Sequence, residues 1–230
     1  MEVRVASLLH GAQKAEGVAI IIDVFRAFTT AAVAIARGVE KIILVAEVDE
    51  ALALRRQGAG HLCMGEVDGI RPPGFDFGNS PYELSRAEHL AGKTLIQSTR
   101  AGTVGVTAAI KAEVIYLGAF VTASATVKSI LASSCPLVSI VAMGVATTNR
   151  ADEDEQCALY LRNLLQGRMP DPDAVQKLVR VGQEAQKYDD PSQPQFHPQD
   201  KEIALQIDRY PFALCVTQED KLLVARKHLP

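Results

Sequence analysis

The sequence lacks the features of disulfide-stabilised, membrane-spanning and nucleic-acid-binding proteins. Its four cysteines lie far apart and form no Cys-x-x-Cys pair, so we expect no disulfides and a reducing compartment. No apolar run approaches the roughly 20 residues of a membrane-spanning helix, and the longest, residues 18–22, stops at Asp23. A net charge of −3 gives no electrostatic reason to expect nucleic acid or an anionic membrane as a partner.

The first residues, Met1-Glu-Val-Arg-Val, also lack the basic and then apolar layout of a secretion signal. We therefore expect a cytoplasmic protein, and the sequence leaves its oligomeric state open, a homo-oligomer included. Its 230 residues, 48% of them hydrophobic, are enough for one large core or two small cores that share a seam. Any bound anion must be held by local arginines and backbone amides, because the overall charge does not attract it.

Short β-branched runs alternate with alanine-rich stretches, a pattern typical of strands connected by crossover helices. We predict an α/β fold with three layers, α/β/α, in a single domain over residues 1–230, with two similar subdomains around a shared cleft as a further expectation. The predicted strands are 18–22, 41–45, 62–64, 94–97, 114–117 and 137–142, followed by a hairpin of 212–217 and 221–225. The predicted helices are 29–37, 48–57, 103–111, 123–132, 153–166 and 171–186, and the predicted loops are 65–82, 144–152 and an exposed loop at 188–199.

Two short motifs repeat along the chain. Arg26-Ala-Phe-Thr29 and Arg100-Ala-Gly-Thr103 each follow an apolar strand and open an alanine-rich helix. Similar strand–loop–helix units cover residues 18–38, 94–112 and 137–166. One interpretation is chance similarity between short α/β units; the other is a partial duplication that brings three helix N-termini around one cleft.

The first of these motifs has the composition of an anion site. At a strand-to-helix junction, free N–H groups and the positive end of the helix dipole face the same point. Arg26 can bind a phosphate or sulfonate with two parallel hydrogen bonds, and Thr29 or Thr30 can add another donor. Alternatively, Thr29 is only a helix cap and Arg26 a surface cation. Asp23, at the end of the preceding strand, is either an ion-pair partner or a metal ligand.

Two further segments are rich in carboxylates. The loop 65–82 contains Glu66, Asp68 and Asp76 among turn-forming glycines and prolines, and Mg²⁺ needs only one or two carboxylates beside phosphate oxygens. The plainer alternative is a set of turns with acids added for solubility. The acidic run at 152–155 is favoured by the helix dipole alone, although Glu153 or Asp154 could also bind metal or activate water.

Taken together, these segments resemble the 2-phosphosulfolactate phosphatase family over roughly residues 18–165. The resemblance is carried by Asp23-Val-Phe-Arg26-Ala-Phe-Thr29-Thr30, Gly65-Glu66, Gly74-Phe-Asp76-Phe-Gly-Asn79-Ser80-Pro81 with Glu83, Gly102-Thr103, and Glu153-Asp154 with Cys157-Ala158. Three places depart from the family pattern. Val67-Asp68-Gly69 replaces Arg-Gly-Gly, Thr99-Arg100-Ala101 replaces Thr-Thr-Asn, and Leu159 replaces a common glycine. The reaction type therefore carries over more safely than the substrate.

The resemblance implies an Mg²⁺-dependent phosphatase that converts 2-phosphosulfolactate into 3-sulfolactate and phosphate, a step of coenzyme M biosynthesis in methanogens. The implied catalytic residues are Asp23, Arg26, Glu66 and Asp76. The implied metal ligands come from Asp23, Glu66, Asp76, Glu153 and Asp154. The implied substrate-binding residues are Thr29, Thr30, Asn79, Ser80, Arg100, Gly102 and Thr103. We expect Arg26→Ala to abolish turnover while changing stability by no more than about 1 kcal/mol, as for a site residue outside the core.

Other phosphatase chemistries lack their residues here. A cysteine nucleophile needs Cys-x₅-Arg, but Cys63 has Gly69 at that spacing and Cys157 has Arg162 one residue early. No Arg-His pair is present, and Phe25 stands where an Asp-x-Asp motif starting at Asp23 needs its second acid. The alternatives that remain are a phosphatase for another small phosphorylated acid and a non-catalytic anion-binding sensor. Direct attack by water and prior phosphorylation of Asp23 also both remain open.

Overall fold

In the computed structural model, which describes residues 1–230, nine strands form one mixed sheet in the order β1-β7-β2-β6-β8-β9-β3-β5-β4. The strands are β1 (Glu2–Ser7), β2 (Gly17–Ile22), β3 (Lys41–Val45), β4 (Leu62–Gly65), β5 (Thr94–Ser98), β6 (Ala112–Gly118), β7 (Leu137–Ala142), β8 (Ala213–Glu219) and β9 (Leu222–His228). The sheet consists of two parallel blocks, β1-β7-β2-β6 and β3-β5-β4. Hairpin β8–β9 lies between the blocks and pairs antiparallel with β6 and with β3.

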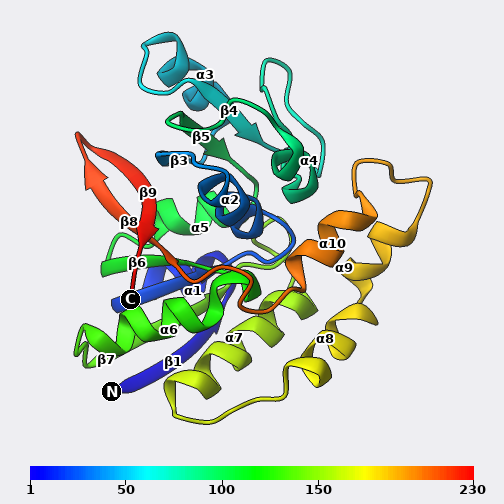
Figure 1. Cartoon of the computed structure of the whole chain (residues 1–230). Coiled ribbons are helices and arrows are strands. Elements are labelled where there is room, and N and C mark those ends of the chain that lie inside the picture. The colour runs from blue at the N-terminus through cyan, green and yellow to red at the C-terminus, as the bar shows by residue number, and fades with distance from the viewer.

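Helices cover both faces of this sheet, which confirms the predicted α/β fold with three layers (Figure 1). The helices are α1 (Leu8–Lys14), α2 (Ala27–Ala36), α3 (Val48–Arg56), α4 (Pro81–Arg86), α5 (Gly102–Ala108), α6 (Ala123–Ala132), α7 (Asp152–Leu165), α8 (Pro172–Arg180), α9 (Gln183–Gln186) and α10 (Pro198–Ala204), with short 3₁₀ turns η1 (Phe120–Thr122) and η2 (Lys187–Asp189). Alternate residues of β2 contribute to opposite layers. Ala19 and Ile21 pack in the core with α2, whereas Ile20 and Ile22 pack in the core with α6 and α7. No helix combines the length and the apolar character that crossing a membrane requires.

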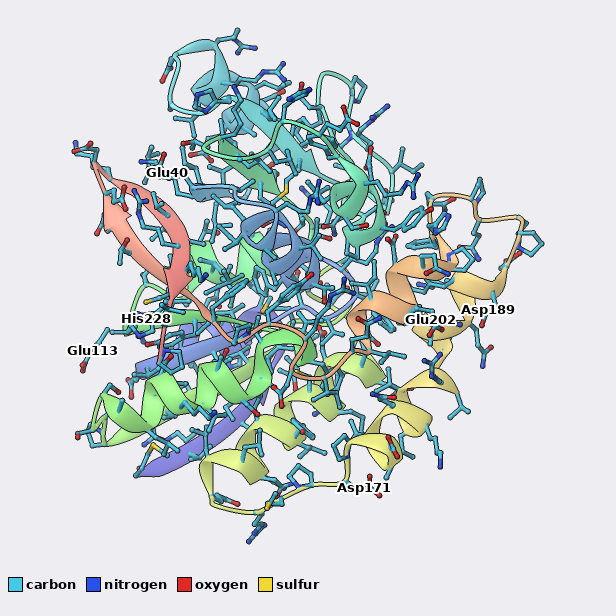
Figure 2. The ribbon with its side chains drawn as sticks, in the orientation of Figure 1. Glu40, Glu113, Asp171, Asp189, Glu202 and His228 are labelled. Atoms are coloured by element: carbon cyan, nitrogen blue, oxygen red, sulfur yellow. The ribbon has the colours of Figure 1, made fainter.

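The carboxyl ends of the strands of both parallel blocks face the same region of the molecule. In a flat sheet they would point in opposite directions, because the three antiparallel pairings β6–β8, β8–β9 and β9–β3 lie between the blocks. Glu40, just before β3, and Glu113, near the start of β6, both lie on the side of the molecule that carries the hairpin (Figure 2). The strands of both blocks therefore run away from the hairpin. At their far ends, Asp23 after β2 accepts a hydrogen bond from the backbone N–H of Gly102, which follows β5. The right-handed twist that accumulates across a large sheet allows the two blocks to meet in this way.

The segment between α7 and the hairpin differs from the prediction. The predicted helix 171–186 is split into α8 and α9, because Gly182 interrupts it where the backbone approaches Asp152 at the start of α7. The predicted exposed loop 188–199 contains buried Tyr188, whose ring packs against those of Phe25 and Phe196 at centroid distances of 5.1 and 5.5 Å. Figure 1 shows this segment, in yellow and orange, on the side of the molecule opposite the hairpin.

Candidate active site

A cavity of about 320 Å³ lies where strands β2, β4, β5 and β7 end. Each of these strands is followed by a loop that contributes side chains to the cavity wall, and the segment containing α9 and η2 closes the other side. The charged residues of the wall are Asp23, Arg26, Glu66, Asp68, Arg100, Glu153, Glu184 and Lys187. Carboxyl ends of parallel strands are the usual ligand-binding edge of an α/β sheet, and this chain concentrates its acids and cations there.

Asp23 joins the N-termini of two helices. Its Oδ1 accepts the N–H of Ala27 at 2.9 Å, in the first residue of α2, and its Oδ2 accepts the N–H of Gly102 at 2.8 Å, in the first residue of α5. A Cβ atom at Gly102 would lie 2.8 Å from Asp23 Oδ2, so the close approach of α5 requires glycine at this position. The two helix ends hold the Asp23 carboxylate rigidly in the cavity wall.

Glu66 and Asp154 are fixed by backbone groups in the same manner. Glu66 accepts the N–H groups of Gly69 and Arg100, each at 2.8 Å, and so connects the loops after β4 and β5. Asp154 accepts the N–H groups of Val24 at 2.8 Å and of Gly144 at 2.9 Å, which connects the loops after β2 and β7. Asp154 is buried behind the wall, whereas its neighbour Glu153 is buried and lines the cavity.

Three acids of this region, Asp23, Glu153 and Asp154, have a pKa raised above that of an ordinary carboxyl group. Burial raises the pKa of Asp23 to about 6, and the nearby Glu66 charge adds to this rise. Burial raises the pKa of Glu153 to about 8, with further contributions from Glu184 and Asp23. Burial and the charges of Glu153 and Asp23 also raise the pKa of Asp154 well above its usual range. Perturbed carboxyl groups that face one cavity are typical of functional sites.

Arg26 is buried, and its guanidinium is already engaged by the protein. Its Nη1 donates to Asp200 Oδ2 and to the carbonyl of Gln195, both at 2.8 Å, and its Nη2 donates to the carbonyl of Gly69 at 3.3 Å. The guanidinium also lies 5.1 Å from the centroid of the Phe196 ring. The expectation of a site residue outside the core was therefore wrong, because only 2% of the side chain is exposed and its charge is matched inside the protein.

Asp76 lies elsewhere. Its Oδ2 accepts hydrogen bonds from Arg55 at 2.8 Å and from the backbone N–H of Cys63 at 2.7 Å. The side chain does not line the cavity. Asp76 thus attaches the loop after β4 to α3 and lies outside the cavity wall.

Several of the predicted hydroxyl residues support the loops instead of facing the cavity. Thr29 Oγ1 donates to the carbonyl of Val24 at 2.8 Å, and Thr103 Oγ1 donates to the carbonyl of Thr99 at 2.9 Å. Thr30 is fully buried, and Ser80 caps α4 by accepting the N–H of Glu83. Of the predicted substrate-binding residues, only Asn79 and Arg100 line the cavity.

Sequence reasoning missed the contribution of residues 184–200. Lys187, Gln193, Gln195 and Phe196 line the cavity, and Asp200 pairs with Arg26 from a position 174 residues further along the chain. The prolines and polar residues of this segment suggested an exposed loop. His197-Pro198 was a usable signal, because His197 caps α10 and proline favours the first helical position.

The donor set of the cavity fits Mg²⁺ through a small number of protein ligands. The wall offers carboxylate oxygens, and no three His, Cys, Asp or Glu side chains are arranged as a metal-binding group. Mg²⁺ keeps several waters and is commonly held by one or two carboxylates plus substrate phosphate. Burial and the charge of Glu66 suppress the ionisation of Asp23, so a divalent cation bound beside these two carboxyl groups would stabilise the ionised form of Asp23.

Strand ends of an α/β sheet are the usual place for a small-molecule site, and the acids and arginines of this cavity suit a small anionic ligand bound together with a cation. The sequence matches the family model described as 2-phosphosulpholactate phosphatase over residues 4–198. The chain belongs to this family and is thereby a member of the phosphoric monoester hydrolases.

Curated relatives agree with this assignment. A protein of Bacillus subtilis is 32% identical over 79% of this chain and 78% of its own length, and one of Thermoplasma volcanium is 32% identical over 82% and 84%. A protein of Carboxydothermus hydrogenoformans is 36% identical over 72% of this chain and 64% of its own length. Each of the three is named "Probable 2-phosphosulfolactate phosphatase".

Proposed function

We propose that this chain is an Mg²⁺-dependent phosphatase that hydrolyses 2-phosphosulfolactate to 3-sulfolactate and phosphate. The observation that carries the proposal is one cavity lined by Asp23, Glu66 and Glu153 together with Arg26 and Arg100. Such a combination suits a cation and a phosphate ester at the same point, because phosphoryl transfer needs positioning and neutralisation of charge. The family and the names of the relatives support the choice of substrate.

Asp23 and Glu66 are the residues proposed to hold the cation. Both carboxylates are fixed by backbone N–H groups, so binding a cation requires little reorganisation of either side chain. When bound, Mg²⁺ supplies charge neutralisation at the phosphoryl oxygens.

Arg100 is the cation proposed to contact the phosphoryl group. Its closest acidic contact is Glu47 at 3.8 Å, and the side chain is 44% exposed, which leaves its guanidinium donors free for a ligand. Arg26 has most of its donors occupied by Asp200, Gln195 and Gly69. Its proposed role is to shape the cavity wall and to hold segment 184–200 in place.

Glu153 is the residue proposed to take the proton from the attacking water. Its carboxylate faces the cavity and accepts no hydrogen bond from another residue's side chain. A pKa of about 8 lies close to neutral pH, where a general base is most effective. We further propose a cytoplasmic location, which the four free cysteines favour.

The proposal is tested by release of inorganic phosphate from 2-phosphosulfolactate, phospholactate and phosphoglycolate, with Mg²⁺ and with excess EDTA. The expected result is Mg²⁺-dependent release that is fastest with 2-phosphosulfolactate. Faster hydrolysis of another phosphorylated acid would show that this acid is the substrate, and the proposed reaction, hydrolysis of a phosphate ester, would stand. No release from any ester in the presence of Mg²⁺ would favour the anion-binding sensor.

A further inference from the structure

A second cavity, of about 720 Å³, adjoins the first. Arg26, Gly69, Asn79 and Gln195 line both cavities, so the two cavities meet along these residues. The remaining wall of the second cavity comes from the loop after β4, from α4 and from the residues before α10. None of the residue roles proposed for the first cavity involves this second cavity.

The two cavities carry opposite charge. Apart from Arg26, whose charge is matched by Asp200, the first cavity sets Arg100 and Lys187 against five carboxyl groups, those of Asp23, Glu66, Asp68, Glu153 and Glu184. The second sets Arg71 and Arg86 against the single carboxylate of Glu83. A ligand with several anionic groups could therefore place one of them beside a metal ion in the first cavity and another beside the arginines of the second.

The basic wall of the second cavity is held in place by the protein. The Arg86 guanidinium lies 5.7 Å from the centroid of the Tyr82 ring, which is stacked on His197 at 4.3 Å with an interplanar angle of 11°. Arg71 Nη1 donates to the carbonyl of Asp76 at 3.2 Å. Aromatic stacking and hydrogen bonding reduce the freedom of these side chains, so they lose less entropy when a ligand binds.

Asn79 provides an independent sign of a ligand. The residue is 5% exposed and lines both cavities, yet its buried Oδ1 has no hydrogen-bond partner. A buried amide without a partner is unfavourable by itself and is typically satisfied by water or a ligand. Its position between the cavities suits a contact with the middle of a molecule that occupies both.

We propose that the second cavity is a subsite for the second anionic group, a carboxylate or sulfonate, of a small phosphorylated acid whose phosphoryl group occupies the first cavity. Arg71 and Arg86 bind this group, and Asn79 contacts the portion between the two anions. This inference rests on the proposed function, and it makes Arg71 and Arg86 the residues that set specificity for acids over neutral phosphate esters.

The test compares Arg71→Gln and Arg86→Gln with the wild type on two substrates. 2-Phosphosulfolactate carries further anionic groups, whereas glycerol 2-phosphate has none beyond the phosphate. Each variant is expected to raise KM for 2-phosphosulfolactate about tenfold, as for loss of a charged hydrogen bond, and to change that for glycerol 2-phosphate by less than about twofold. Arg56→Gln, an exposed arginine of α3 outside both cavities, is the control and should leave both KM values unchanged.

An equal effect on the two substrates, or no effect, would overturn the subsite. Calorimetric binding of 3-sulfolactate separates this outcome from failure of the proposed function. If the wild type hydrolyses neither ester, binding of 3-sulfolactate that weakens about tenfold in both variants and not in Arg56→Gln still supports the subsite. Absence of 3-sulfolactate binding to an inactive wild type would overturn both.

Discussion

Arg26 and Asp200 form an ion pair that is almost completely removed from solvent, with exposures of 2% and 0%. The other oxygen of Asp200 accepts the hydroxyl of Ser80 at 2.6 Å and the N–H of Tyr82 at 2.9 Å. The pair therefore connects the starts of α2 and α4 to α10. A buried charge is tolerated only while its partners remain, so this pair contributes to both the shape of the site and the stability of the fold.

Arg26→Ala is expected to lower the free energy of unfolding by about 3–5 kcal/mol, because it leaves the Asp200 carboxylate buried without its counter-ion. Chemical denaturation measures this change. Arg56→Ala, at an exposed position, should stay within about 0.5 kcal/mol of the wild type. A loss below about 1 kcal/mol in Arg26→Ala would restore the expectation from sequence and contradict a buried pair.

Glu153 should make the metal-free protein less stable as pH rises. Its pKa is raised from 4.5 to about 8 in the folded state, so between these values the folded protein holds a proton that the unfolded chain releases. The free energy of unfolding therefore falls with increasing pH across this window and is lowest, for this group, above pH 8.

Glu153→Gln is expected to flatten this pH dependence and to be more stable than the wild type above about pH 8 in EDTA, by an order of 2–4 kcal/mol. Denaturation midpoints of the variant and the wild type, measured from pH 5 to pH 9, test this prediction. Part of the pH dependence of stability remains in the variant, because the pKa values of Asp23 and Asp154 are also raised in the folded state. Glu50→Gln, at an exposed position of α3, is the control and should follow the wild type. Parallel curves for Glu153→Gln and the wild type would refute the assignment.

At the scale of secondary-structure elements, α2 and α5 are joined at their N-termini through the Asp23 carboxylate. The closeness of this junction is visible at Gly102, where an added Cβ would lie 2.9 Å from Ala27 Cβ and 3.0 Å from Phe28 Cζ. The first turn of α5 therefore has no room to accommodate even a methyl group without displacing Asp23.

Gly102→Ala should lower stability by about 1–3 kcal/mol, the usual effect of overpacking, and should reduce phosphatase activity because Asp23 moves. Gly92→Ala is the matched control. The added methyl group at position 92 meets no atom within 4 Å, so only its left-handed backbone opposes the change, by about 1 kcal/mol. Wild-type activity in Gly102→Ala would show that the α2–α5 junction does not position the site.

The elements predictable from sequence are those with strong local patterns. The strands at 41–45 and 137–142 and the helix at 123–132 agree with β3, β7 and α6 residue for residue. The predicted hairpin is also present, with its turn at Asp220 and Lys221, which both have positive φ. Strand β1 and helix α1 were missed, as was α4, although the Ser80 cap followed by proline indicated its start.

The candidate site was predictable only where its residues follow strands. Asp23, Glu66, Arg100 and Glu153 lie at strand or helix ends, which a local pattern reveals, and the structure brings them to one cavity. Whether a side chain at such a position faces the cavity or the core depends on packing with distant segments. Asp76, which pairs with Arg55, shows how a nearby partner redirects a side chain that local reasoning assigned to the site.

At the scale of the whole molecule, the cavity depends on both parallel blocks of the sheet. Asp23 and Glu153 come from the block β1-β7-β2-β6, and Glu66 and Arg100 come from the block β3-β5-β4. The C-terminal hairpin connects the two blocks on one side. Near the cavity, Asp200 connects them by binding Arg26, which follows β2, and Ser80 and Tyr82, which lie between β4 and β5. Local sequence patterns contain no information on these contacts, because they join the C-terminal part of the chain to segments that lie far earlier in the sequence.

The central claim is that the Asp23 cavity binds a cation and a phosphate ester and hydrolyses the ester. The most direct measurement is the rate of phosphate release from 2-phosphosulfolactate by Asp23→Asn and by the wild type at the same Mg²⁺ concentration. Because asparagine keeps the size of the side chain but removes its charge, we predict a rate at least about 100-fold lower in the variant. A variant rate within about twofold of the wild type would contradict the claim.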